Sequence, residues 1–267
     1  MDNKRAVKLE RPHNRFAGLA AVVTGGANGM GRAQALKLAS EGAKVAILDI
    51  DEVAGRKTAA EIAKSGGQSL FFKVDLTKRD QIEHCIEEVI RAWGRISLLF
   101  SNAGRVIVKA YHKTTDEDYD TMMSLNVRAT FLLTRKVLPH MVEQGGGSIV
   151  IMSSFNASRA VPLESIYSVS KAAVESLAKN IAVEYRTRNI RCNAVAPAFV
   201  RTTHGLREID DFKALGIEWN DQALADTQIR VCEPDEVADV ALFAASEEAS
   251  FMNGSVLSVD NGWTAKG

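Results

Sequence analysis

A tyrosine and a lysine four residues apart, Tyr167 and Lys171, are well suited to move a proton. On a helix, residues at this spacing share a face, so the lysine ammonium can lie beside the phenol and favour its ionised form. A phenol ordinarily titrates near pH 10, roughly three units too high for a base at neutral pH. We therefore expect Lys171 to lower the pKa of Tyr167. Together with Ser154, thirteen residues (167 − 154) before the tyrosine, and a glycine-rich turn near the start of the chain, this pair predicts a site that moves a hydride and a proton.

A glycine-rich turn, Thr24 to Gly31, lies near the start of the chain between an apolar run and a helix-like segment. Glycines let the backbone approach a pyrophosphate closely, and the helix that follows offers unpaired N–H groups and a partial positive charge. Glycine-rich turns are common, but a strand before this one and a helix after it favour dinucleotide binding.

Asp49 ends the second apolar run, where its carboxylate can accept hydrogen bonds from the adenosine ribose hydroxyls of a dinucleotide. A carboxylate there would repel a ribose phosphate, and neither Asn28 nor Ile50 offers a positive charge. We therefore predict NAD rather than NADP as the cofactor. Asp49 could instead cap the helix that starts near Glu52, a role that Asp51 could also fill.

Strand-like and helix-like segments alternate along the chain, which predicts a doubly wound (Rossmann) α/β fold of about seven strands with helices on both faces. Parallel pairing follows, since each crossover must carry the chain back across the sheet. We expect one domain, residues 16–267, after a flexible arm of residues 1–15. The expected strands are 19–24, 44–48, 69–74, 96–100, 148–152, 191–195 and 255–259, and the expected helices are 31–41, 52–64, 81–93, 115–144, 167–186 and 234–246. In such sheets the ligand lies at the carboxyl ends of the strands, where Gly25, Asp49, Asp75, Asn102, Ser154 and Pro197 fall.

The composition narrows the possible partners of this 267-residue chain. Lys plus Arg equals Asp plus Glu at 33 each, which argues against nucleic acid or a membrane surface as the main partner. The 3 cysteines are too scattered for a disulfide framework, and the 5 histidines show no paired ligand spacing, so we expect no metal. No run approaches the roughly 20 apolar residues of a membrane-spanning helix. We expect a cytoplasmic protein whose partner is a small-molecule substrate.

These motifs resemble those of the short-chain dehydrogenase/reductase family over about residues 19–264. The family's T-G-x-x-x-G-x-G turn matches Thr24 to Gly31, its N-A-G matches Asn102 to Gly104, and its Y-x-x-x-K matches Tyr167 to Lys171. The resemblance implies Asn126, Ser154, Tyr167 and Lys171 as catalytic residues, with the spacing to the tyrosine selecting Ser154 over Ser153. The residues expected at the cofactor are Gly25, Asn28, Gly29, Met30, Gly31, Asp49, Ile50, Asp75, Leu76, Asn102, Ala103, Gly104, Tyr167, Lys171, Pro197, Val200 and Thr202.

The resemblance implies an NAD-dependent oxidoreductase that acts on a secondary alcohol, such as a cyclic alcohol, diol or sugar, and its ketone. Tyr167 would take the proton from the substrate hydroxyl during oxidation and return it during reduction. Ser154 would hold the substrate oxygen, Lys171 would also bind the nicotinamide ribose, and Asn126 would anchor a water that relays protons. The alternatives are a 3-oxoacyl thioester reductase and a dinucleotide-binding regulatory protein without turnover. For Asp75, capping of the helix after Thr77 is as good a reading as contact with the adenine.

By the same resemblance, the segment after the sixth strand, residues 199–226, is expected to form a mobile substrate lid. Its basic residues could bind an anionic substrate or belong to a solvated charged face, and its apolar residues could form a pocket wall. The chain has Pro197-Ala198 where the family usually has Pro-Gly. Helices 115–144 and 167–186 are apolar around much of their circumference, which suggests burial against another subunit, and the resemblance implies a homodimer or homotetramer. The basic residues in or near the lid are Arg201, His204, Arg207, Lys213 and Arg230, and the apolar ones are Phe199, Leu206, Leu215, Ile217 and Trp219.

Overall fold

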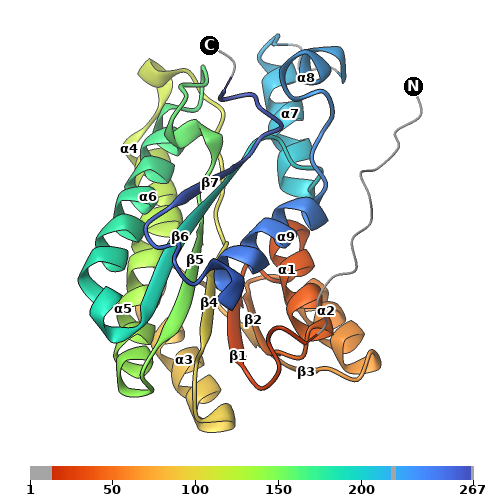
Figure 1. The fold of residues 1–267 in the computed structure, drawn as a ribbon. Coiled ribbons are helices and arrows are strands. Elements are labelled where there is room, and N and C mark those ends of the chain that lie inside the picture. Colours follow the sequence, from red (N-terminus) through yellow and green to blue (C-terminus); the bar gives the residue numbers. More distant parts are fainter. Residues whose placement is uncertain (1–13, 218–220, 266–267) are drawn as a thin grey trace.

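In residues 14–217 and 221–265, which the computed structural model describes, the chain forms a seven-stranded parallel sheet between two layers of helices (Figure 1). The strand order is β3-β2-β1-β4-β5-β6-β7, so the predicted doubly wound α/β fold is confirmed. Most of the expected arm lies outside the described residues. Arg15, at its end, is bound to Glu41 and, at 2.9 Å, to Glu248, so this residue lies against the domain.

Seven strands, nine helices and five short helical turns are present in the described residues. The strands are β1 (Ala20–Thr24), β2 (Lys44–Asp49), β3 (Gln68–Lys73), β4 (Leu98–Ser101), β5 (Gly147–Met152), β6 (Ile190–Pro197) and β7 (Val256–Val259). The helices are α1 (Gly29–Ser40), α2 (Glu52–Lys64), α3 (Arg79–Trp93), α4 (Asp116–Met123), α5 (Ala129–Glu143), α6 (Ser165–Tyr185), α7 (Thr203–Ala214), α8 (Asp221–Gln228) and α9 (Pro234–Ala245). The short helical turns are η1 (Tyr111–Lys113), η2 (Ser124–Arg128), η3 (Phe155–Ala157), η4 (Arg186–Arg188) and η5 (Glu247–Ala249).

The direction of winding changes beside β1, which pairs in parallel with both β2 and β4. Thr24 ends β1 and is fully buried there. Its hydroxyl oxygen accepts hydrogen bonds from the backbone N–H groups of Asn102 (2.9 Å) and Ala103 (3.1 Å). The loop after β4 is thereby held against the glycine turn after β1, at the switch point where doubly wound sheets bind ligands.

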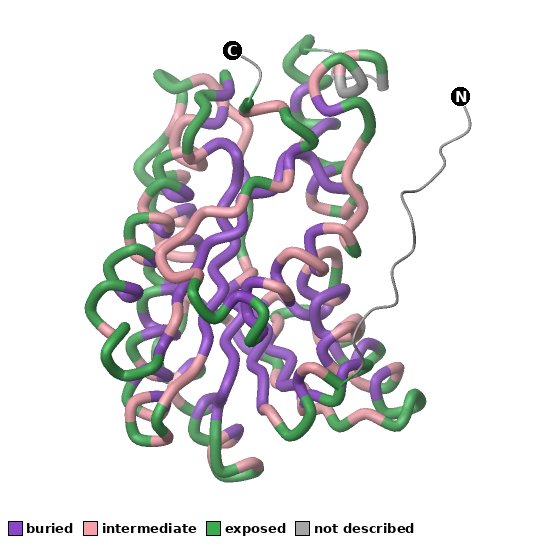
Figure 2. The backbone as a smooth tube through the Cα atoms, in the orientation of Figure 1, coloured by how far each residue is buried: buried purple, intermediate pink, exposed green. Residues whose placement is uncertain are grey.

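Apolar side chains cover both faces of the sheet. Helices α3, α5 and α6 contribute Ile86, Leu133 and Val174 to the core on one face, whereas α1 and α9 contribute Leu38 and Leu242 on the other. Figure 2 shows the strands as the buried centre and the outer turns of the helices as the exposed surface. Burial of one such side chain stabilises a fold by about 1.5–3 kcal/mol, so the core holds the strand ends in fixed relative positions.

The helix expected over residues 115–144 is present over residues 116–143, but it contains a π-helical turn, η2, between α4 and α5 that was not predicted. Asn126 lies in this turn and is 2% exposed. Its side-chain amide donates to the carbonyl oxygen of Arg105 (2.9 Å) and to the Ser170 hydroxyl (2.9 Å), which draws the residue inward. A π-helical turn contains one residue more than an α-helical turn, which allows Asn126 to contact Arg105 and Ser170. Such turns are frequent at functional sites.

Neither a membrane span nor a metal cluster occurs in the described part of the chain. Among residues 14–217 and 221–265, no helix is long and apolar enough to cross a bilayer. Within the same ranges, no three His, Cys, Asp or Glu side chains lie close enough together to hold a metal ion. The cysteines are free thiols, and Cys85 and Cys192 are buried.

Candidate active site

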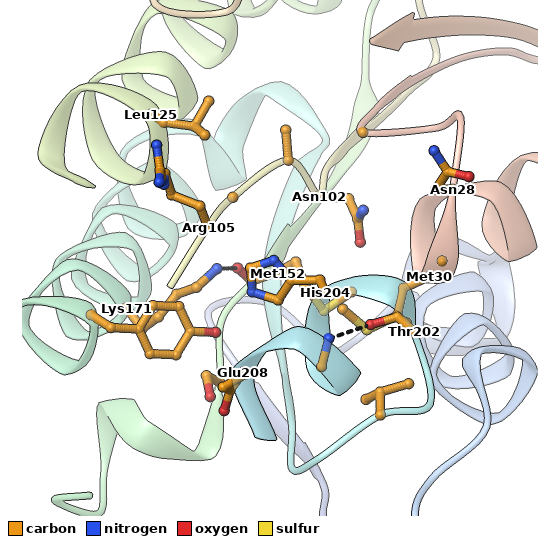
Figure 3. Close-up of a pocket in the computed structure, with 18 of the residues that line it drawn as sticks. Asn28, Met30, Asn102, Arg105, Leu125, Met152, Lys171, Thr202, His204 and Glu208 are labelled. Atoms are coloured by element: carbon orange, nitrogen blue, oxygen red, sulfur yellow. Dashed lines mark hydrogen bonds between the residues drawn. The ribbon is translucent and has the colours of Figure 1, made fainter. Parts of the chain in front are cut away.

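A pocket of about 800 Å³ opens at the carboxyl ends of the strands (Figure 3). This volume lies within the usual range for small-molecule sites. The loops after β1, β2, β3, β4 and β6 contribute its cofactor side, and the loop after β5, α4, η2, α6 and the lid segment contribute the rest. Of the residues expected at the cofactor, the structure places around the pocket Gly25, Asn28, Gly29, Met30, Asp49, Ile50, Asp75, Leu76, Asn102, Ala103, Gly104, Tyr167, Lys171, Pro197, Val200 and Thr202.

The glycine turn fits the pyrophosphate of a dinucleotide. Gly25 has a φ of +63°, and a Cβ atom on it would lie 3.1 Å from the Cα of Ala103. Gly29 has a φ of +53°, and a Cβ atom there would lie 3.0 Å from the side chain of Thr202. The residue before α1, Asn28, makes no side-chain cap, so the first N–H groups of this helix are left for an anion. Gly31 does not line the pocket but packs beneath the turn.

Asp49 presents its carboxylate to the pocket from the end of β2. Its two oxygens accept hydrogen bonds from the backbone N–H groups of Ala27 (3.0 Å) and Asp51 (3.0 Å), which fixes their orientation. The cap of α2 is Asp51, whose side chain accepts from the N–H of Ala54. Asp49 is therefore free of the capping role that the sequence left open.

Asp75 does not cap α3, and its expected contact with the adenine stays a prediction. It lines the pocket, and its Oδ1 also accepts from the backbone N–H (2.9 Å) and the hydroxyl (2.7 Å) of Thr77. These bonds form a turn ahead of α3, whose capping residue is Lys78.

Ser154, Tyr167 and Lys171 meet at the inner end of the pocket. Helix α6 begins at Ser165, so Tyr167 and Lys171 lie on one face of its first turns. Lys171 is 5% exposed, and its ammonium donates to the carbonyl oxygen of Met152 at 2.8 Å (Figure 3). Ser154 follows the same strand end, and its side chain hydrogen-bonds to that of Tyr167. The neighbouring Ser153 instead donates to Glu175 (2.8 Å).

The electrostatics of Tyr167 differ from the expectation that Lys171 lowers its pKa. Burial raises the pKa of Tyr167, the nearby carboxyl groups of Glu208 and Glu164 raise it further, and the hydrogen bond with Ser154 opposes them. Lys171 does not offset this, because its ammonium is turned to Met152 and lies 5.6 Å from the centre of the tyrosine ring. Burial also lowers the pKa of Lys171 to about 8, so the side chain still carries most of its positive charge at neutral pH.

Asn126 lies behind the pocket wall rather than on it. Its Oδ1 accepts from the backbone N–H of Arg105 (2.9 Å). A Cβ atom on Gly104 would lie 3.2 Å from that oxygen and 3.4 Å from the ammonium of Lys171. The residue therefore holds the loop after β4 next to Lys171, and its expected part in a water relay stays a prediction.

The lid segment contains two helices, α7 and α8, that the sequence pattern did not predict. Arg201, Lys213 and Arg230 are paired with Glu233, Asp210 and Glu236, as expected for a solvated charged face. His204 and Arg207 line the pocket instead. Burial, with Arg207, Lys171 and Arg105 nearby, lowers the pKa of His204 to about 4, so its imidazole is neutral at physiological pH.

The apolar wall of the pocket is not the one expected from the lid. Leu206, Leu215 and Ile217 are exposed, and Trp219 lies outside the described residues. Only Phe199 of that set lines the pocket, together with Phe155. Trp263, near the end of the chain, packs on both rings, with centroid distances of 4.2 Å to Phe155 and 6.0 Å to Phe199. Phe155 directly follows Ser154, and this position beside an expected catalytic residue could have predicted that Phe155 lines the pocket.

Several pocket residues that carry charge or hydrogen-bonding groups were not singled out from the sequence as site residues, among them Arg105, Asn156 and Glu208. Arg105 directly follows the Asn102 to Gly104 motif, and Asn156 lies two residues after Ser154. Glu208 lies one helical turn after His204 on α7, so the two residues share a helix face, and this spacing could have predicted that Glu208 lines the pocket. Ala198, at the departure from Pro-Gly, has no positive φ and donates its N–H to Val259 (3.1 Å), so alanine is accommodated without backbone strain.

Known proteins with the same motifs match nearly the whole chain. A family model described as enoyl-(acyl carrier protein) reductase matches residues 25–264. A 3-oxoacyl-[acyl-carrier-protein] reductase of Thermotoga maritima is 36% identical, covering 93% of this chain and 98% of its own length. A cyclopentanol dehydrogenase of Comamonas sp. is 35% identical, covering 91% of this chain and 96% of its own length. The crystal structure of levodione reductase superposes with a TM-score of 0.89 at 30% identity and covers 94% of this chain and 100% of its own. The chain is therefore an oxidoreductase of the short-chain dehydrogenase/reductase family.

Proposed function

We propose that this oxidoreductase uses NAD and interconverts a secondary alcohol and its ketone. The observation that carries the proposal is the meeting of Ser154, Tyr167 and Lys171 at the end of a pocket whose other end is a glycine turn. The dinucleotide, when bound, supplies the acceptor or donor of the hydride. A hydroxyl, a phenol and an ammonium are the groups that proton transfer at a substrate oxygen requires.

Each of the four expected catalytic residues has a role that follows from its position. Tyr167 takes the proton from the substrate hydroxyl and returns it in the reverse reaction. Ser154, which hydrogen-bonds to Tyr167, holds the substrate oxygen beside the phenol. Lys171 binds the nicotinamide ribose, and its bond to Met152 fixes the side chain for that purpose. Asn126 anchors the loop at Gly104 and a proton-relaying water.

The preference for NAD rests on the charges around Asp49. A ribose phosphate in this part of the pocket would meet the carboxylate of Asp49, and the carboxylate of Asp51 lies behind Asn28, to which it is hydrogen-bonded. Lys73 is paired with Asp49 in the sheet register, but its ammonium lies 3.2 Å from Glu52. Asn28, which faces the same region, bonds to Asp51 at 3.2 Å and carries no charge. This arrangement favours ribose hydroxyls over a ribose phosphate.

The substrate that we favour is a small cyclic alcohol or ketone. Phe155 and Phe199 line the pocket, and cyclopentanol and levodione are named as substrates of similar proteins. A 3-oxoacyl thioester is the second candidate, because the 3-oxoacyl-[acyl-carrier-protein] reductase of Thermotoga maritima is also similar. A biosynthetic reduction of a thioester would usually draw on NADPH, whose ribose phosphate the carboxylate of Asp49 disfavours. Asp49 therefore supports the cyclic alcohol or ketone.

The proposal is tested by following NADH absorbance with purified protein. Cyclic secondary alcohols, diols and sugars would be offered with NAD and with NADP, and cyclic ketones and a 3-oxoacyl thioester with the reduced cofactors. We expect turnover of a cyclic alcohol or ketone with the NAD couple. Turnover only of the thioester with NADPH, or binding of NADH without turnover of any substrate, would contradict the proposal in favour of one alternative or the other.

We also propose a homodimer or homotetramer in the cytoplasm. Val174 and Ile181 are buried within the chain, but Phe131 on α5 and Val183 on α6 are 44% and 65% exposed. Apolar side chains left on these helices favour burial against a second copy. Light scattering at micromolar concentration should give at least twice the mass of one chain, and a monomer would refute this assembly.

A further inference from the structure

Two carboxyl groups, the buried Glu164 and the partly buried Glu208, lie near Tyr167. Glu164, the residue before α6, is 1% exposed. Glu208 projects from the lid helix α7 into the pocket (Figure 3). Each carboxyl group affects the pKa of the other, and both raise the pKa of Tyr167, so the two groups lie close to each other and to the phenol. Two ionised carboxylates repel, so this contact requires a proton on one of them.

The surroundings of Glu164 also require that proton. Its Oε2 accepts a hydrogen bond from the side-chain amide of Asn156. Its Oε1 is buried and receives no bond from an amide, hydroxyl or cationic donor in residues 14–217 and 221–265. A buried oxygen without a donor is costly, and a protonated Glu208 supplies the donor.

The backbone before Glu164 is in an unfavourable conformation. Leu163 has a φ of +68°, which a bulky residue rarely adopts. Its carbonyl oxygen accepts a hydrogen bond from the N–H of Lys109 (2.7 Å), which holds this conformation in place. Strain of this kind persists only where the surrounding structure maintains it, and here it brings a carboxyl group to the start of the catalytic helix.

The pair is connected to the proposed catalytic groups. The hydroxyl of Ser154 donates to Asn156 Oδ1 and accepts from its backbone N–H, both at 3.3 Å, and Asn156 binds Glu164. The charged groups that act on the pair are Asp211 on α7 and the two glutamates themselves, whereas Arg207, Lys171 and Arg105 act on His204. Burial raises the pKa of Glu164 to about 7, and burial together with Glu164 raises the pKa of Glu208 well above its usual range.

We propose that Glu164 and Glu208 share one proton and act as a positioning pair that controls how readily Tyr167 ionises while α7 is seated on the pocket. This inference rests on the proposed function of Tyr167. With the shared proton, the pair carries one negative charge beside the phenol. Loss of the proton adds a second charge, which opposes ionisation of Tyr167 and makes the two carboxylates push α7 away from α6.

The first test is the pH dependence of kcat/KM for alcohol oxidation. Glu208→Gln and Glu164→Gln each remove one carboxyl group, so Tyr167 should ionise more readily. We expect the pH of half-maximal kcat/KM to fall by about half a unit or more in both variants. Asp210→Asn, a matched change at an exposed carboxylate of α7, should leave it unchanged. A half-maximal pH for Glu208→Gln equal to that of the wild type would overturn the proposal.

The second test does not depend on turnover. Infrared spectra at pH 7 should contain the C=O stretching band of a protonated carboxyl group in the wild type and in Asp210→Asn. The band should be missing in Glu208→Gln, whose folding is checked by circular dichroism, and in Glu164→Gln. Turnover of an alcohol without this wild-type band would overturn the shared proton. The band without turnover of any secondary alcohol would support the pair and contradict the proposed function.

Discussion

A Cβ atom on Gly31 would lie 2.2 Å from the carbonyl oxygen of Gly25, so the start of α1 packs directly against the glycine turn. The same atom would lie 2.7 Å from the side-chain amide of Asn102. Gly31 therefore supports the site without lining the pocket, because any side chain there would displace both the turn and the loop after β4.

Gly31→Ala should destabilise the fold by about 1–3 kcal/mol and weaken NADH binding by about tenfold or more, because the turn must move to admit the methyl group. Thermal unfolding and NADH fluorescence titration measure the two effects. Gly66→Ala is the matched control, since Gly66 has a φ of +82° but nothing within 4 Å of its would-be Cβ. It should lower stability and leave NADH affinity intact. Equal affinity losses in the two variants would contradict this role of Gly31.

Replacing Asp49 should relax the discrimination against NADP. In Asp49→Ser the carboxylate is gone, so kcat/KM with NADP relative to NAD should rise by about tenfold or more. Asp51→Asn removes a charge two residues away and preserves the cap of α2, because Asn caps helices as well as Asp. It should have the smaller effect. An unchanged cofactor ratio in Asp49→Ser would show that the carboxylate does not select the cofactor.

Glu164 should make the protein less stable as the pH rises towards neutrality. Its pKa in the fold is about 7, above the ordinary value of 4.5, so between these values the folded state binds more protons than the unfolded state. This contribution to stability is complete below pH 4.5 and is lost as the pH rises through about 7. The Tm of Glu164→Gln minus that of the wild type should therefore increase from pH 5 to pH 8. A difference in Tm that is constant over this range would contradict the raised pKa.

The fold and the cofactor side of the pocket followed from local sequence features. Asp49, Asn102 and Pro197 each lie at the carboxyl end of a strand, and parallel strands bring these ends to one edge. The spacing of apolar residues and the lengths of the apolar runs predict such strand ends, because both are properties of residues close together in the sequence. The π-helical turn at Asn126 could not be predicted in this way, since its cause is contact with Arg105 and Ser170, distant in sequence.

The substrate side depended on long-range contacts that spacing does not encode. Tyr167 and Lys171 share a helix face as expected, but Met152 binds the ammonium, and Glu208 reaches the phenol from a helix that begins at residue 203. Tertiary contacts likewise decide which charged residues of the lid form ion pairs and which line the pocket. Arg201 binds Glu233, whereas Arg207 faces the pocket, and nothing in their local sequence distinguishes them.

The central claim is that Tyr167 transfers the proton during oxidation of a secondary alcohol by NAD. The most direct test compares Tyr167→Phe with the wild type, with NADH binding measured by fluorescence and turnover by absorbance on the best substrate found. We predict a fall in kcat/KM of about 10²–10⁴-fold or more, with NADH affinity within a few-fold of the wild type, because only the hydroxyl group is lost. A variant that binds NADH normally and keeps its turnover would contradict the account.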